Sequence, residues 1–286
     1  MSNLFNVKNV ALLFLMFSLY SCSKNDVETL ESLKTDPLIN KQNWNLIWED
    51  NFNTIDTISS WSRIPKGGVA WNKYMDYNPN CFTHENGEVT LRGIINENPS
   101  DDLEFLTGGL WTRGKKTIDY GKIEVRAKMN KVYGAWPAIW MISDEKKWPE
   151  GGEIDIVETY NREDIINHTI HTPFTLNNNV DGHVINHKAI RIKNKSEYNT
   201  YGVIINETEI IYTINGIITF IYPNLESKFQ DQYPFGCKKF LILSMQLNYS
   251  STVLVDKNDL PAEMTIDWVR FYMKIDKNLP DYEKVD

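Results

Sequence analysis

The sequence predicts an all-β protein, an antiparallel two-sheet β-sandwich of jelly-roll type with an open concave cleft. Residues 121–129, GKIEVRAKM, alternate apolar and polar side chains, which is typical of a strand with one buried face. Residues 209–222, EIIYTINGIITFIY, place two β-rich runs around Asn215-Gly216, a strong hairpin signal. No segment shows a helical period over four turns, and roughly a dozen strands with turn signals between them indicate a sandwich.

Seven further strands are expected, each an apolar or β-branched run bounded by polar or turn residues. In chain order they are NLIWED (45–50), EVTLRG (88–93), GAWPAIWMI (134–142), INHTIHT (166–172), YGVIIN (201–206), KFLILSMQL (239–247) and MTIDWVRFYM (264–273). Together with the first three strands they account for most of residues 44–275, which we take as one domain and expect to be monomeric.

Composition excludes some partners. The chain has 286 residues, a net charge of −8 and a pI of about 5.3, so a general affinity for nucleic acid or anionic membranes is not expected. The 9 Trp, 14 Tyr and 12 Phe suit either a large β core or a groove that stacks flat ligands. The two cysteines of the domain, Cys81 and Cys237, are expected to stay unpaired, because a domain of this size needs no covalent staple.

The N-terminal end reads as an export signal. Residues 10–19, VALLFLMFSL, are too short to span a bilayer and suit the apolar part of a signal peptide over residues 1–21. The following LYSC resembles a bacterial lipobox, which implies a lipidated Cys22 and a protein anchored at the outer membrane, cell surface or periplasmic face. An ordinary secretory signal with an incidental cysteine is the alternative. Residues 22–43 then form a flexible tether, and residues 276–286 form a charged tail.

Three carboxylates in a buried strand carry the functional signal. In GGEIDIVE, alternation places Glu153 and Asp155 on one face but would bury Glu158 beside isoleucines. A β-bulge resets the phase and sends Glu158 to the face of the other two acids. Two such glutamates could act as nucleophile and acid/base of a retaining glycosidase, with an acid between them coupling their titrations. A calcium site and a solvated acidic face are the alternatives.

These segments resemble the catalytic core of glycoside hydrolase family 16, over roughly residues 44–272. The resemblance lies in GGEIDIVE with YGKIEVRAKM and GAWPAIWMI before it, HTIH after it, and WNLIWEDNF, LTGGLWTRGK and LPAEMTIDWVRFY along the chain. It implies a β-jelly-roll glycosidase that needs no cofactor for catalysis. By position, Glu153 resembles the nucleophile, Asp155 the assisting acid and Glu158 the acid/base.

The resemblance also implies substrate-binding residues. Tryptophans stack on the apolar faces of sugar rings, and three lie near the acids. The expected substrate-binding residues are Trp136, Trp148, Trp140, His171, Trp71, Asn72 and Gln246. Trp140 could equally belong to the core, and His171 could bind Glu158, bind the sugar or be structural. A structural calcium near Asp267 is possible, although Asn51 stands where a nearby acid is usual.

The same comparison points to a class of substrate. Residues 248–252 read NYSST where many glucan-cleaving members have Gly-Gly and a Trp, and residues 72–80 lack the E-x-Q-x-Y pattern of laminarinases. AWNKYM with LTGGLWTRGK resembles the Bacteroides-type branch with galactose-containing targets. We therefore expect an endo-acting, retaining β-glycosidase for which a β-galactan or mucin-type glycan is favoured over a β-1,3- or mixed-linkage glucan. The alternative is a surface glycan-binding lipoprotein on the same fold.

Overall fold

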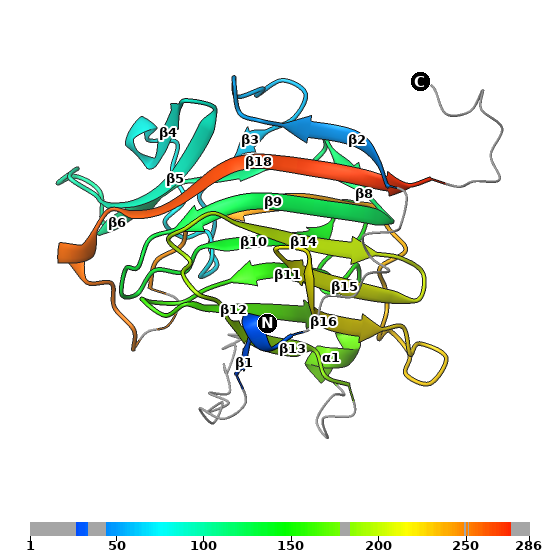
Figure 1. The fold of residues 1–286 in the computed structure, drawn as a ribbon. Coiled ribbons are helices and arrows are strands. Elements are labelled where there is room, and N and C mark those ends of the chain that lie inside the picture. Colours follow the sequence, from blue (N-terminus) through cyan, green and yellow to red (C-terminus); the bar gives the residue numbers. More distant parts are fainter. Residues whose placement is uncertain (1–26, 34–43, 178–183, 249, 251, 276–286) are drawn as a thin grey trace, which may run out of the picture.

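The chain folds into two large β-sheets that pack face to face in the computed structural model (Figure 1). The structure describes residues 27–33, 44–177, 184–248, 250 and 252–275. The first sheet, here called the acid sheet, contains, from one edge to the other, β1 (Glu28–Thr29), β13 (His187–Arg191), β12 (Ile165–His171), β11 (Glu153–Glu158), β10 (Ala138–Ser143), β17 (Lys239–Ser244), β7 (Gly109–Trp111) and β3 (Ser62–Arg63), with β8 (Thr117–Ile118) also beside β17.

The second sheet has the order β16 (Ile217–Pro223), β15 (Glu209–Ile214), β14 (Asn199–Ile205), β9 (Gly121–Met129), β18 (Ala262–Lys274), β5 (Glu88–Ile95) and β4 (Phe82–Glu85). In addition, β2 (Trp44–Asp50) pairs with β18 and β6 (Phe105–Thr107) pairs with β5. The longest helix among the described residues is α1 (Pro173–Asn177). The predicted all-β, antiparallel two-sheet fold is confirmed.

The core lies between the sheets, where the inward-facing residues of both meet. Strand β9 shows the predicted alternation, because Ile123, Val125, Ala127 and Met129 are at most 1% exposed while the residues between them are half-buried. The hairpin of β15 and β16 turns at Asn215 and Gly216, whose φ angles of 52° and 77° are those that this turn needs. Cys81 and Cys237 are both buried, and neither forms a disulfide within the described part of the chain.

The N-terminal segment corrects one prediction. Residues 27–33 were expected within a flexible tether, but Glu28 and Thr29 pair in parallel with Ile190 and Arg191 of β13. Leu30 begins a short 3-10 helix, η1 (Leu30–Ser32), and is 7% exposed against the core. The tether prediction was wrong for these residues because burial of Leu30 and edge pairing hold the segment on the domain.

Several predictions lie outside the described residues. These are the signal peptide, the lipidated Cys22, the rest of the tether, the charged tail, and positions 249 and 251 of NYSST. Within the described part of the chain, no helix is long and apolar enough to cross a membrane.

Candidate active site

A β-bulge in β11 sets the direction of the acids. Val157 pairs with Ile139 of β10, but Asp155 pairs with the next residue, Trp140, so the register skips Ile156. The pairing with β12 is interrupted at the same place, between Asp155 and Glu158. Both Ile156 and Val157 are fully buried, whereas Glu158 is partly exposed. The predicted bulge is therefore confirmed.

Cross-strand pairing shows which residues share the face of the acids. Ala138, Trp140 and Ile142 of β10 lie opposite Glu158, Asp155 and Glu153, respectively. On the other side, Asn167, Thr169 and His171 of β12 lie opposite the same three acids. Paired residues project to the same side of a sheet, so these side chains form one surface, here called the acid face. Trp136 precedes β10 and also reaches this face, because its indole N–H donates to Glu158.

Glu158 is held by donors from three directions. The indole Nε1–H of Trp136 donates to its Oε1 at 2.8 Å, and the Thr169 hydroxyl donates to its Oε2 at 3.4 Å. The Tyr160 hydroxyl also hydrogen bonds to this carboxylate. The rings of Trp136 and Tyr160 stack with centroids 6.0 Å apart, and Trp136 is 9% exposed. Trp136 thus orients a catalytic candidate, a role that sequence reasoning, which expected sugar stacking, did not assign.

Glu153 has a similar partner at the other end of the strand. The indole Nε1–H of Trp148 donates to Oε2 of Glu153, while the ring remains 46% exposed. The preceding Gly152 has φ of +71°, and a Cβ there would lie 2.3 Å from the ring of Phe235. Only glycine fits this close approach, which brings Glu153 onto the strand from a tight turn.

Asp155 lies between the two glutamates on β11, and His171 lies on the neighbouring strand β12, opposite Glu153. Asp155 is 3% exposed and hydrogen bonds to Glu153. The His171 Nε2 lies 3.3 Å from Asp155 Oδ2, so the structure places this histidine against Asp155 rather than Glu158. Among the described residues, Glu153, Asp155 and His171 are the one group of acids and histidines whose ligand atoms lie close enough, within 4.8 Å, to hold a metal ion.

Burial dominates the ionisation of the three acids. It raises the pKa of Glu153 and of Asp155 well above their usual ranges, and each is raised further by a neighbouring carboxylate. Burial also raises the pKa of Glu158, although His171 and the hydrogen bonds from Trp136, Tyr160 and Thr169 oppose this shift. Because three neighbouring carboxyls resist holding three charges, the cluster retains protons to a higher pH than isolated carboxyls do.

A small apolar cluster forms the floor of the acid face, next to the three acids. Its buried members are Ile64, Met75, Ala138, Trp140, Phe240 and Ile242. Trp140 is 5% exposed, its Nε1–H donates to Ser244 Oγ at 3.1 Å, and its ring forms a T-shaped pair with Trp71 at a centroid distance of 4.9 Å. Trp140 therefore lies in this floor, and the partly exposed Trp71 covers it.

The remaining predicted residues lie in different settings. Gln246 is 2% exposed and donates to Ser244 Oγ at 2.8 Å, while its own Oε1 has no hydrogen-bond partner among the residues that the structure describes. Asn72 closes a turn, because its Oδ1 accepts from the Val69 N–H at 3.3 Å. Asp267 is ion-paired with Arg126 on the second sheet. A guanidinium bound to the carboxylate opposes a divalent cation at the same oxygens, so this arrangement does not favour calcium at Asp267.

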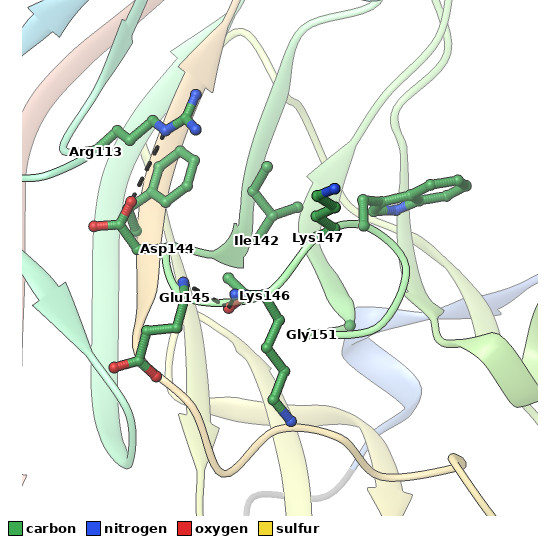
Figure 2. Close-up of a pocket in the computed structure, with 11 residues that line it drawn as sticks. Arg113, Ile142, Asp144, Glu145, Lys146, Lys147 and Gly151 are labelled. Carbon is green, nitrogen blue, oxygen red and sulfur yellow. Dashed lines mark hydrogen bonds and ion pairs between the residues drawn. The ribbon is translucent and has the colours of Figure 1, made fainter.

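A hollow of about 280 Å³ opens beside the turn that carries Trp148. Figure 2 shows Arg113 and Asp144 on one side of it and Lys147 on the other, with Ile142 between them. The hollow lies next to Glu153, because Ile142 and Trp148 line it, and Ile142 pairs with Glu153 while Trp148 hydrogen bonds to it. Arg113 is ion-paired with Asp144 at 3.9 Å, and its guanidinium also lies over the Trp111 ring, 5.4 Å from the centroid.

Sequence reasoning missed the residues that support Glu158 from outside the acid motif. Tyr160 follows Glu158 by two positions, and its turn is held by Lys195, whose Nζ donates to Thr159 Oγ1 at 3.1 Å and to the Asn161 carbonyl at 2.7 Å. Lys195 is 1% exposed, and burial lowers its pKa to about 8. Lys195 lies 37 positions after Glu158 and belongs to no motif, so the sequence alone could not predict its role beside Glu158.

The arrangement has the parts of a double displacement at a sugar. Two glutamates lie on one face, each anchored by an indole N–H, with an acid between them that hydrogen bonds to Glu153. One carboxylate can attack while the other gives and takes a proton, and aromatic rings flank both.

Comparison with known proteins places the chain among glycosidases. The family model described as Glycosyl hydrolases family 16 matches residues 75–270. The chain is 31% identical over 281 residues to the keratan-sulfate endo-1,4-beta-galactosidase of Sphingobacterium multivorum, covering 92% of this chain and 66% of that protein.

Two solved structures are similar throughout the domain. The catalytic domain of a laminarinase, an endo-1,3-beta-glucanase from Thermotoga petrophila, matches with a TM-score of 0.72 and 26% identity, covering 82% of this chain and 100% of that one. A structure from work on endo-acting O-glycanases that human gut microbiota express to initiate mucin breakdown matches with a TM-score of 0.68 and 27% identity, covering 81% and 100%.

Proposed function

Because this chain belongs to glycosyl hydrolase family 16, we propose that it is an endo-acting β-glycosidase that cleaves internal linkages with retention of configuration. The observation that carries the proposal is the bulge in β11, which places Glu153 and Glu158 on one face with Asp155 between them. A protein that only binds glycans needs the flanking aromatic rings but none of these buried acids.

In the first half of the reaction, Glu153 attacks the anomeric carbon and forms a covalent glycosyl-enzyme. For this it must be ionised, so at this stage the proton of the hydrogen-bonded pair has to lie on Asp155, whose pKa burial raises well above its usual range. Glu158 donates its proton to the departing glycosidic oxygen. Its raised pKa supports this step, because the carboxyl keeps its proton at a pH where a solvent-exposed glutamate has lost it.

In the second half, Glu158 is ionised and acts as a base. It takes a proton from water, which attacks the anomeric carbon and releases Glu153. The hydrogen bonds from Trp136 and Thr169 support the charged form of Glu158 at this stage. Two inversions at the same carbon give net retention, and the steps require no metal or redox cofactor.

For the substrate, we propose a β-galactan or mucin-type glycan in preference to a β-glucan. The similarity to a keratan-sulfate endo-β-galactosidase and to a structure from work on mucin O-glycanases supports this class. The chain spans 66% of the length of that galactosidase, so the comparison concerns only the shared part. The hollow of about 280 Å³ beyond Glu153 is of a size for one sugar unit rather than an oligosaccharide.

We further propose that the protein acts outside the cytoplasm, anchored through a lipid on Cys22. The support is the apolar run at residues 10–19 followed by LYSC. Cys22→Ala should move the protein from the membrane to the soluble fraction of the export compartment. Unchanged membrane partition of the variant would exclude this anchor.

Digestion of a glycan panel tests the activity. The panel contains laminarin, mixed-linkage glucan, agarose, carrageenan and mucin O-glycans, and mass spectrometry identifies the ends of the products. Oligosaccharides released from within the mucin glycans are expected, and proton NMR of the first product should show the β-anomer. Initial α-product would overturn the double displacement, and release of oligosaccharides from laminarin alone would overturn the proposed substrate.

A further inference from the structure

A buried imidazole lies directly behind the bulge. His168 belongs to β12, but its side chain points away from the acid face into the core, where it is 0% exposed. Its Nδ1 lies 2.7 Å from the carbonyl oxygen of Ile156, the residue that the register of β11 skips.

The two ring nitrogens of His168 have different partners. A carbonyl oxygen only accepts, so Nδ1 carries the hydrogen and donates to Ile156. The Nε2 lies 2.9 Å from Thr219 Oγ1 and accepts from that hydroxyl. Burial lowers the pKa of His168 to about 4, so the ring is neutral at ordinary pH and this single tautomer satisfies both contacts.

The second sheet holds this ring in place. Thr219 is on β16, and Tyr212 of β15 packs on the imidazole with ring centroids 4.7 Å apart. The Tyr212 hydroxyl donates to the Thr169 carbonyl at 3.0 Å, next to His168 in the chain. Neighbours on the opposite sheet thus bind both the ring and its strand, which leaves the imidazole little freedom to turn.

We propose that His168 is a positioning residue for catalysis, which holds the Ile156 carbonyl and so keeps the bulge that turns Glu158 toward the substrate. This inference rests on the proposed role of Glu158 as acid/base. Ile156 has no register partner on either neighbouring strand, and a buried carbonyl without a donor is unfavourable. Loss of the donor therefore favours relaxation of the strand, and in a strand of regular alternation Glu158 faces the core.

Two substitutions separate the two contacts of the ring. In His168→Asn, the side-chain amide can place an N–H where Nδ1 was, so the bond to Ile156 is kept and the contact to Thr219 is lost. In His168→Gln, the amide lies near the position of Nε2, so the contact to Thr219 is kept and the donor to Ile156 is lost. Both remove the ring from the same buried site, so each is the control for the other.

Leaving-group dependence reports the position of Glu158. The assay compares kcat/KM for the polysaccharide that the wild-type enzyme degrades with kcat/KM for the 2,4-dinitrophenyl β-glycoside of the disaccharide that it releases. The aryl oxygen leaves without protonation, so only the polysaccharide needs Glu158 as an acid in this step. The ratio of two rates from one preparation does not depend on how much of it is folded.

We expect His168→Gln to lose at least about tenfold on the polysaccharide and less than about threefold on the aryl glycoside, within the range that general acid catalysis supplies. His168→Asn should keep the wild-type ratio of the two rates. If His168→Gln does not fold, His168→Phe replaces it, because phenylalanine keeps the ring volume and lacks the donor. Equal losses on both substrates in the variant without a donor, or equal ratios in the Asn and Gln variants, would overturn the proposal.

Glu158→Gln is measured in the same two assays, so that failure of the proposed function can be told apart from failure of this inference. A selective loss on the polysaccharide in Glu158→Gln, with no change of ratio in the His168 variants, overturns the positioning role alone. An unselective loss in Glu158→Gln overturns the acid/base role of Glu158 and the inference with it.

Discussion

The indole nitrogen of Trp136 lies 2.8 Å from Oε1 of Glu158 and donates to it. Trp148 makes the corresponding bond to Glu153, so each glutamate has its own tryptophan donor. A donor from a large, packed ring both restricts the rotamer of a carboxylate and favours its charged form. Trp136, at 9% exposed, therefore acts more through Glu158 than through its open surface.

Trp136→Phe should change the pH dependence of the reaction. The hydrogen bond from Trp136 lowers the pKa of Glu158, so its removal raises that pKa, and the alkaline limb of the kcat/KM profile moves to higher pH. Loss of orientation should reduce kcat by about tenfold. Steady-state rates across pH 4–9 measure both effects. An alkaline limb that stays in place or moves to lower pH contradicts the assignment of Glu158 as the acid.

Glu153→Gln and Glu158→Gln should each reduce hydrolysis of the polysaccharide by at least about a thousandfold, because each glutamate carries a chemical step. Glutamine keeps the shape of the side chain, so thermal unfolding should show an intact fold. Glu163→Gln, at an exposed glutamate on the turn after β11, is the matched control and should retain full activity. Wild-type rates in either site variant on an unactivated polysaccharide would refute the proposed mechanism.

Asp155→Asn should stabilise the fold, and the gain should grow as pH rises. The folded pKa of Asp155 is well above its unfolded value, so above about pH 4 the folded state binds more protons than the unfolded state. Wild-type stability at this site is then lost as pH rises toward the folded pKa, and asparagine removes that loss. Melting temperatures of the two proteins at pH 4, 6 and 8 test this. A difference that shrinks with rising pH would show that Asp155 is stabilised as an anion.

Trp148→Ala should mainly affect substrate binding, whereas Trp140→Ala should mainly affect the stability of the fold. Trp148 is 46% exposed, so its loss should raise KM with little change in melting temperature, although the lost bond to Glu153 also lowers kcat. Trp140 is 5% exposed in the floor of the acid face, so its truncation should destabilise the fold by about 3–5 kcal/mol. Urea unfolding and Michaelis–Menten kinetics separate the two effects. A Trp140 variant of normal stability with a raised KM would make it a sugar-binding residue.

The features predicted correctly from sequence are those with a strict local pattern. Alternation in β9, the Asn215-Gly216 turn and the phase error at Glu158 each depend on neighbours in the chain. Strands β3 (Ser62–Arg63), β6 and β7 are too short to show a period, and β1 depends on an edge of β13 far away in sequence. Their pairing is decided by the tertiary fold.

The site shows the same division. Glu153, Asp155 and Glu158 lie together because of the register of a single strand, and their spacing in the sequence was enough to predict this. The indole bond of Trp136, the hydroxyl of Tyr160 and the imidazole of His168 depend on rotamers and on contacts across strands and sheets. The order of residues in a sequence does not specify side-chain rotamers, so it cannot show where a ring nitrogen points.

In the gene, the bulge of β11 amounts to one codon. An in-frame deletion of Ile156 would leave EIDVE, in which strict alternation carries all three acids on the same face with no interruption of pairing. The bulged and regular strands are therefore one deletion apart. In the shortened strand His168 would have no skipped carbonyl to bind, so only its contacts with Thr219 and Tyr212 would still hold the ring.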